Sequence, residues 1–302
     1  MLRERELCVR TDNNESAPIK SSADFRARIE TSIRNRTDSL LSSFRTILKG
    51  SEGWESASPT DEEQFLDQID EAQAQFDRRN PLNKERSHTD FIETVFKPMT
   101  FDKYRFATNK LEYAAQDAHV DLVGWPFLIF PSTRRELLSQ TSEGIEVLIS
   151  TTDFANQDIS DFWRLNESGL FYKRELTPTI NMPPASTSAP RVLWQFAEAI
   201  YCLNRLYQRL LSDSDLITLS VTIHRTRGRA LVWQEKGFHY STYQANRPQI
   251  EVRATHSLTE WRASLEDHAV ELSREVFRCF QLENPDETMM RTQIRNILQR
   301  RL

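Results

Sequence analysis

The sequence predicts an α+β protein in which an N-terminal helical hairpin packs on, or extends from, a mostly antiparallel sheet flanked by helices. Three patterns indicate this class. Apolar residues recur at helical spacing near both ends of the chain, apolar and polar residues alternate in several central segments, and turn-forming residues separate these segments. We therefore divide the chain into a mobile segment (1–22), the helical hairpin (23–87) and an α+β domain (88–302).

Two helices make up the predicted hairpin, which we expect to serve as an assembly element. Residues 24–50 carry one apolar stripe, formed by Phe25, Ile29, Ile33, Leu40, Phe44 and Ile47. In the second helix, Phe65, Ile69, Ala72 and Phe76 share a face, and Asn80-Pro81 ends it. A short polar link favours antiparallel packing of two such helices. Their apolar seam is expected to meet the rest of the chain or a second copy.

Alternation places strands in the central region, at residues 145–150 and 217–224. Residues 169–175 and 229–234 are further strand candidates, and Thr226-Arg227-Gly228 is expected to connect two strands as a hairpin. A loop rich in Pro, Thr and Ser covers 176–190. A core helix is predicted over 192–210, then a helical pattern over 258–279 and a short basic helix from about residue 287.

Composition bounds the function classes. The net charge of -5 and the pI of about 5.8 argue against attraction of the whole molecule to nucleic acid or to an anionic membrane. The three cysteines, Cys8, Cys202 and Cys279, are too far apart for a metal knuckle and odd in number for a disulfide framework. No apolar stretch of membrane-spanning length and no signal-peptide pattern is present. We expect a cytoplasmic protein that does not contact a membrane.

Glycine usage also excludes several enzyme classes. Phosphate-binding loops need clustered glycines, but the seven glycines of this chain are dispersed, and the Gly-x-Ser-x-Gly motif of serine hydrolases is missing. The sequence thus favours a protein that is not an enzyme and holds neither a cofactor nor a metal ion.

The candidate binding residues are aromatic and arginine side chains in or beside predicted strands. Pro126 restricts the chain around Trp125, and the simplest interpretation is that Trp125 and Phe127 fill the core between helices and sheet. The alternative is a ligand or partner surface made by Trp125, Phe127, Trp163, Arg164, Tyr172, Arg227 and Arg229. Converging guanidinium groups could bind an anion; an ion-paired solvated face is the ordinary outcome.

Two other functions stay open. A divergent metal-dependent hydrolase or nuclease would use some of Asp90, His119, Asp121 and His224, although satisfied histidines are the commoner outcome. Nucleic acid could be bound through basic helices: one set is Arg26, Arg28, Arg34, Arg36 and Arg45, and the other is Arg291, Arg295, Arg300 and Arg301. Acidic neighbours dilute both sets.

The order of several landmarks resembles the region that follows the ATP-binding domain in bacterial proteins of the Schlafen-AlbA type. The landmarks span about residues 90–300: Gly124-Trp125-Pro126-Phe127, Glu146, Asp161-Phe162-Trp163-Arg164, Gly169-Leu170-Phe171, Gly228-Arg229-x-Leu231, and Glu271-Leu272-x-x-Glu275-Val276-Phe277-x-x-Phe280. Nothing before residue 90 resembles that ATP-binding domain, so its activity is not transferred.

The resemblance implies an accessory or sensor domain, without the ATP-binding domain itself. On this basis we expect an oligomeric, non-enzymatic sensing or scaffolding subunit of a prokaryotic antiviral defence or stress system. Its expected partner is a separately encoded ATPase or nuclease, or a second copy of the chain.

Overall fold

The computed structural model describes residues 60–80, 91–119, 122, 126–152, 158–176, 186–232 and 243–299, together with the backbone of 8–10 and 16–18. The chain divides into two units, Met1–Pro59 and Thr60–Leu302. In the first unit, strands β1 (Cys8–Arg10) and β2 (Ser16–Pro18) form an antiparallel pair. The helix predicted over 24–50 lies outside the described residues, so the hairpin as a whole stays a prediction.

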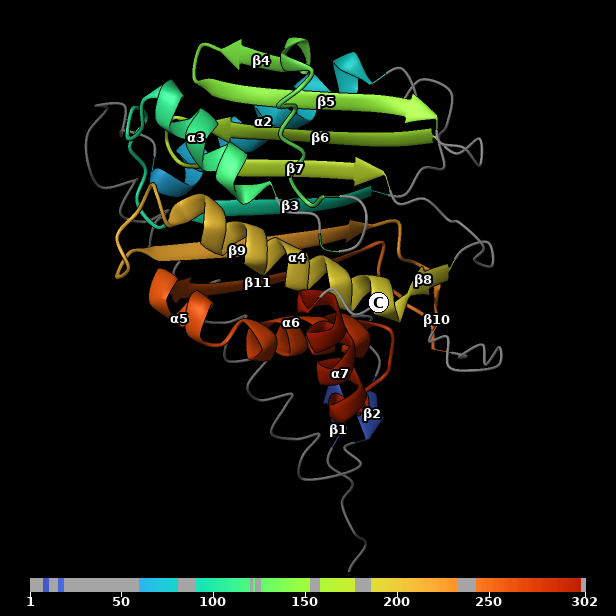
Figure 1. Ribbon diagram of the computed structural model, residues 1–302. Coiled ribbons are helices and arrows are strands. Elements are labelled where there is room, and N and C mark those ends of the chain that lie inside the picture. Colours follow the sequence, from blue (N-terminus) through green and yellow to red (C-terminus); the bar gives the residue numbers. More distant parts are fainter. Residues whose placement is uncertain are drawn as a thin grey trace, which may run out of the picture. The chain divides into compact units, whose positions relative to one another are not determined.

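The second unit is built on a seven-stranded sheet, with helices on both faces (Figure 1). Its order is β11-β9-β3-β7-β6-β5-β4, and every neighbouring pair is antiparallel. The strands are β3 (Phe91–Pro98), β4 (Leu138–Thr141), β5 (Gly144–Thr152), β6 (Asp158–Asn166), β7 (Phe171–Leu176), β9 (Leu216–His224) and β11 (Gln249–Ser257). The α+β class with a mostly antiparallel sheet is confirmed.

Five helices cover one face of this sheet: α3 (Thr108–Ala118), α4 (Ala189–Tyr207), α5 (Leu258–Ala263), α6 (Leu265–Cys279) and α7 (Glu287–Leu298). The main hydrophobic core lies between these helices and the alternate strand residues that point toward them, such as Phe96, Trp163 and Leu219. Burial of this large apolar set is the dominant favourable term in folding. Ser188 caps α4, the predicted core helix, by accepting a hydrogen bond from Arg191 N.

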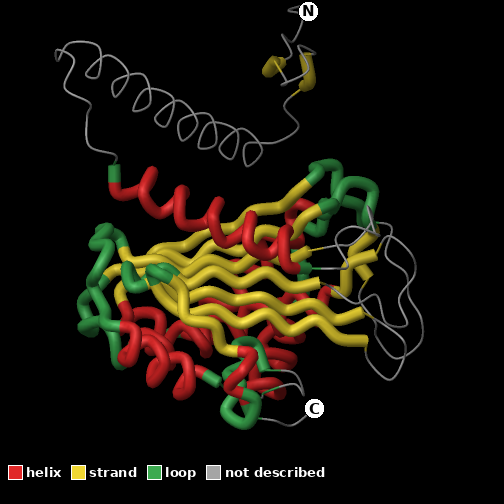
Figure 2. The backbone as a smooth tube through the Cα atoms, turned by 90° about the horizontal axis from the view of Figure 1, so that it is seen from above, coloured by secondary structure: helices red, strands yellow, loops and turns green. Residues whose placement is uncertain are grey.

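Among the described helices, α2 (Asp61–Arg79) alone lies on the opposite face, as Figure 2 shows. Its bounds confirm the second predicted helix. Thr60 and Glu63 form a capping box, with acidic residues in the first turn and basic residues in the last. Phe65, Ala72 and Phe76 turn toward the sheet and are buried. This side therefore has a much smaller apolar cluster than the side of α4.

The hairpin predicted at Thr226-Arg227-Gly228 is wrong. The following strand, β10 (Ala230–Val232), pairs in parallel with β8 (Ser186–Ser188), and β9 pairs with β3 and β11 instead. Main-chain bonds join this turn to residues near 245, because Gly228 N donates to Ala245 O and Ala245 N to Arg229 O. The single helical pattern over 258–279 also divides into α5 and α6, with a break at Ser264.

Candidate functional site

Strand β7 carries four consecutive ionisable residues in the middle of the sheet: Tyr172, Lys173, Arg174 and Glu175. Strand geometry sends successive side chains to opposite faces. Lys173 and Glu175 therefore lie under α4, and Tyr172 and Arg174 lie under α2. A central strand that is covered on both faces normally carries apolar residues. Strand β7 instead carries charged side chains on both faces, so we take it as the centre of the candidate site.

The α4 side holds a buried ionic cluster. Lys173 Nζ lies 2.5 Å from Asp161 Oδ2 and 2.9 Å from Glu175 Oε2, and Arg191 Nη2 lies 3.1 Å from Glu175 Oε1. The ammonium group also lies 5.0 Å from the ring centroid of Phe127. Burial acts to lower the pKa of Lys173, but the two carboxylates outweigh it and raise the pKa to about 12. Lys173 is therefore held as a buried cation.

The α2 side is organised around the carboxylate of Glu93. Its Oε1 accepts a hydrogen bond from Tyr172 OH at 2.7 Å, and its Oε2 lies 2.8 Å from His224 Nε2. Gln73 of α2 donates to the same group at 3.3 Å. Burial acts to raise the pKa of Glu93, but the contacts with His224 and Tyr172 outweigh it and lower the pKa. Glu93 is therefore ionised and fully engaged.

Two arginines on the α2 side are oriented by the sheet itself. Arg164 Nε donates to Asn166 Oδ1 at 2.8 Å. The Arg174 guanidinium stacks on Phe91, with its Cζ 4.3 Å from the ring centroid, and its Nε lies 3.5 Å from Glu93 Oε1. Both guanidinium groups therefore hold their positions through strand residues, before any contact with α2 is counted.

Acidic side chains of helix α2 form ion pairs with basic side chains of the sheet. Glu71 Oε1 lies 3.1 Å from Arg164 Nη1, and Asp77 Oδ1 lies 3.4 Å from Arg174 Nη1. Glu62 forms ion pairs with Lys97 and, at 3.7 Å, with Arg253. One pair has the opposite sense, since Arg79 of α2 contacts Glu146 of β5. We call the sheet residues Lys97, Glu146, Arg164, Arg174 and Arg253 the α2-docking face.

The structure does not bring the described sequence-predicted candidates to one place, although it pairs Arg164 of β6 with Tyr172 of β7. Phe127 and Trp163 lie in the core on the α4 side, where Trp163 Nε1 donates to Ile129 O at 2.9 Å. Arg164 and Tyr172 lie on the α2 side. Arg227 and Arg229 follow β9, the first exposed and the second buried, while Trp125 lies outside the described residues. The core position expected for Phe127 is confirmed.

The histidines considered for a metal-dependent enzyme are used in other ways. Nδ1 of His119 lies 3.0 Å from Leu128 O and accepts from Phe130 N at 3.0 Å, and His224 contacts Glu93. Asp90 and Asp121 lie outside the described residues. Within the part of the chain that the structure describes, no group of three His, Cys, Asp or Glu residues is placed to hold a metal ion.

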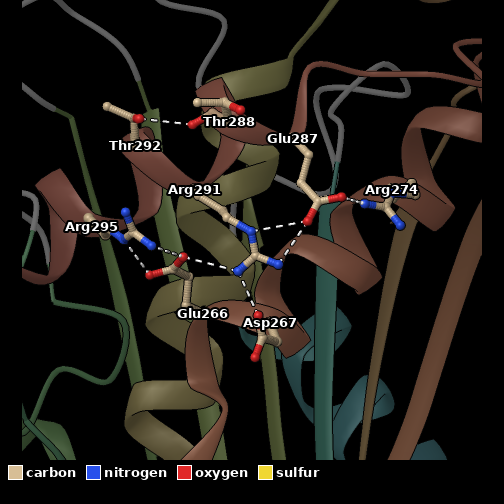
Figure 3. A network of polar contacts seen from close by, with 8 residues as sticks. All are labelled: Glu266, Asp267, Arg274, Glu287, Thr288, Arg291, Thr292 and Arg295. Atoms are coloured by element: carbon tan, nitrogen blue, oxygen red, sulfur yellow. Dashed lines mark hydrogen bonds and ion pairs between the residues drawn. The ribbon is translucent and has the colours of Figure 1, made fainter.

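Two of the C-terminal arginines considered for nucleic acid form ion pairs with acids of α6 and α7 (Figure 3). Arg291 contacts Glu287, Asp267 at 2.6 Å and Glu266 at 3.1 Å, and Arg295 also contacts Glu266, at 2.7 Å. The hydrogen bonds that Arg291 donates to these carboxylates raise its pKa. The network joins α7 to α6 and neutralises these two arginines.

Three exposed apolar residues belong to segments that meet near the end of β3. Leu66 of α2 is 47% exposed, Met99 is 51% exposed and Leu216 is 46% exposed. Met99 N donates to Leu216 O at 3.2 Å, and Phe65, next to Leu66, packs edge-on against Phe101 at 5.0 Å. We call Leu66, Met99 and Leu216 the apolar corner.

No family model, curated protein or solved structure matches this chain. The resemblance to the Schlafen-AlbA accessory region therefore stays a prediction from the sequence. Among the described residues, no helix combines the length and the apolar character needed to cross a bilayer.

Sequence reasoning missed Glu93, Lys173 and the acids of α2, although it considered Arg174 among the strand arginines that could converge on an anion. A signal for them is present: Lys173-Arg174-Glu175 interrupts a strand whose other residues are apolar or aromatic. Three charges in a row within a central strand require partners on both faces. The acids of α2 gave no such signal, because acidic residues are common on any solvated helix.

Proposed function

We propose that this chain is a non-enzymatic sensing or scaffolding subunit that acts with a separately encoded catalytic partner. The proposal places it in the cytoplasm, as part of a prokaryotic defence or stress system, in line with the family resemblance in its sequence. Self-association through the N-terminal hairpin belongs to the same proposal.

The apolar corner is the observation that carries this proposal. Leu66 of α2, Met99, which follows β3, and Leu216 of β9 are each about half exposed. Scattered exposed apolar residues are ordinary, but a group of large ones at one place is typical of a protein–protein contact. The conformational variety of Met also suits contact surfaces.

Affinity purification of the tagged full-length chain from its native host tests the proposal. Mass spectrometry should identify a co-purifying ATPase or nuclease, and Leu66→Ser combined with Met99→Ser should reduce its recovery about tenfold or more, as loss of central apolar contacts does. Tyr113→Ser is the control, because Tyr113 is also a large exposed side chain but lies on α3.

Two results would contradict the proposal. One is equal recovery of the partner with the double variant. The other is a wild-type chain that is monomeric by light scattering and brings down no catalytic protein.

A further inference from the structure

We propose that the α2-docking face is a binding site for an acidic amphipathic helix of a protein partner, and that α2 is its resident occupant. This inference rests on the proposed interaction function and specifies the surface and the kind of partner. The partner helix would replace α2 on the sheet.

Charge complementarity is the first support. Seven of the nineteen residues of α2 are acidic: Asp61, Glu62, Glu63, Asp67, Asp70, Glu71 and Asp77. The sheet presents four bases to it, and three of these acids contact them. In these pairs the acids are about half exposed, whereas Lys97, Arg164 and Arg174 are 8%, 1% and 14% exposed, so salt screens the pairs only from the side of the acids. A helix bound in this way can be exchanged for another of similar charge.

Apolar anchors supply the remaining specificity. Phe76 packs against Phe91 and Phe162, with ring centroids 5.7 Å and 5.9 Å apart. Phe65 and Ala72 are buried on the same side of the helix. Anchors at positions i, i+7 and i+11 are the pattern of an amphipathic helix in a groove. A partner helix would need an aromatic residue at each end and a small residue between them.

The face is preformed, which lowers the cost of exchanging one helix for another. Arg164 is held by Asn166, and Arg174 by Phe91 and Glu93, all of them strand residues. Helix α2 also carries its own capping box, so leaving the sheet does not remove the hydrogen bonds at its N-terminus. The arginines of the sheet therefore keep their strand contacts when the helix leaves.

A helix fits this face better than a nucleic acid does. Glu93 and Glu146 lie among the bases and would repel phosphates. Glu146 is instead matched by Arg79 of α2, so the face recognises a mixed charge pattern. Such a pattern also fixes the direction in which a helix binds.

A labelled peptide of residues 60–80, titrated into full-length protein, tests the inference. In the variant chain that carries Glu71→Lys and Asp77→Lys, both new lysines face arginines of the sheet. Repulsion between these charges should increase the fraction of molecules in which α2 has left the sheet. We expect this variant to bind the peptide about tenfold more tightly than the wild type does. Thr60→Ala removes only an exposed cap and should produce a smaller gain, of a few fold.

Two controls isolate the docking contacts. Asp67→Lys with Asp70→Lys makes the same charge change at exposed positions that form no ion pair with the sheet in the described ranges, and should bind the peptide as the wild type does. A peptide with Glu62→Gln, Glu71→Gln and Asp77→Asn should bind the Glu71→Lys, Asp77→Lys variant about tenfold more weakly than the native peptide.

The inference is overturned if the variants stay folded by circular dichroism and bind no peptide, or if the neutralised peptide binds equally well. Displacement of the peptide by single-stranded DNA would assign the face to polyanions instead. A peptide-free dimer of the Glu71→Lys, Asp77→Lys chain, seen by light scattering, would assign it to a second copy. Recovery of a partner by a Met99→Ser variant, which leaves α2 unchanged, tests the proposed function separately.

Discussion

The surrounding residues determine how much each charged side chain of β7 contributes to stability. Lys173 is enclosed by Asp161, Glu175 and the ring of Phe127, whereas Arg174, one residue later, reaches Asp77 at the protein surface. The first is a buried pair, in which removal of one partner leaves an uncompensated charge. The second is a partly solvated pair with a modest net contribution.

Lys173→Met tests this distinction. Removing the ammonium group takes a buried cation away from both Asp161 and Glu175, so we expect the free energy of unfolding to fall by about 3–5 kcal/mol in urea titrations. Lys103→Met, which breaks an exposed pair with Glu143, should have a much smaller effect. Equal losses in the two variants would mean that the Lys173 cluster is not a buried ionic unit.

Single positions were the hardest to place from the sequence. Alternation correctly placed Ile145 and Val147 of β5 and the apolar residues of β9 in the core, but Glu146 and Thr218 on the opposite face are buried as well. It does not distinguish the two sides of a sheet that is covered on both. Trp163 and Arg164 are adjacent candidates in the sequence, yet β6 sends one to the core and the other to α2.

The turn that joins β4 to β5 depends on close backbone packing. A Cβ atom on Gly144 would lie 2.1 Å from Leu165 O, and the φ of this residue is +156°. The antiparallel contact between Gly144 and Asn166 therefore leaves no space for a side chain. This contact fixes the register of β5 against β6 from its first residue.

We expect Gly144→Ala to lower the free energy of unfolding by about 3 kcal/mol or more, since it combines steric overlap with backbone strain. Gly228→Ala is the matched control. Its φ is also positive, at +75°, but no atom lies within 4 Å of the added Cβ, so only strain of about 1–2 kcal/mol applies. Similar losses in chemical denaturation would argue against the close contact at Gly144.

Helices were easier to predict than strand partners. The stripes of α2 and α4 follow from spacing within one segment, and both were confirmed within a few residues. Strand pairing depends on residues far apart in the sequence. The turn after β9 has the composition of a hairpin, but β9 finds its partners in β3 and β11, more than twenty residues away on either side.

The whole second unit has two unlike interfaces on one sheet. The α4 side contains the large apolar core together with one buried ionic cluster. The α2 side combines a small apolar cluster with a row of ion pairs that reach the solvent. The first composition is that of a domain interior, and the second is that of a contact between separate proteins.

Hydrogen–deuterium exchange of the full-length chain at low and high NaCl tests this division most directly. Because its ion pairs are screened, α2 should exchange faster than β6 and β7 and should accelerate further in high salt, while the strands do not. Exchange of α2 at the rate of those strands, unchanged by salt, would show that the helix is an integral part of the core and not a replaceable occupant.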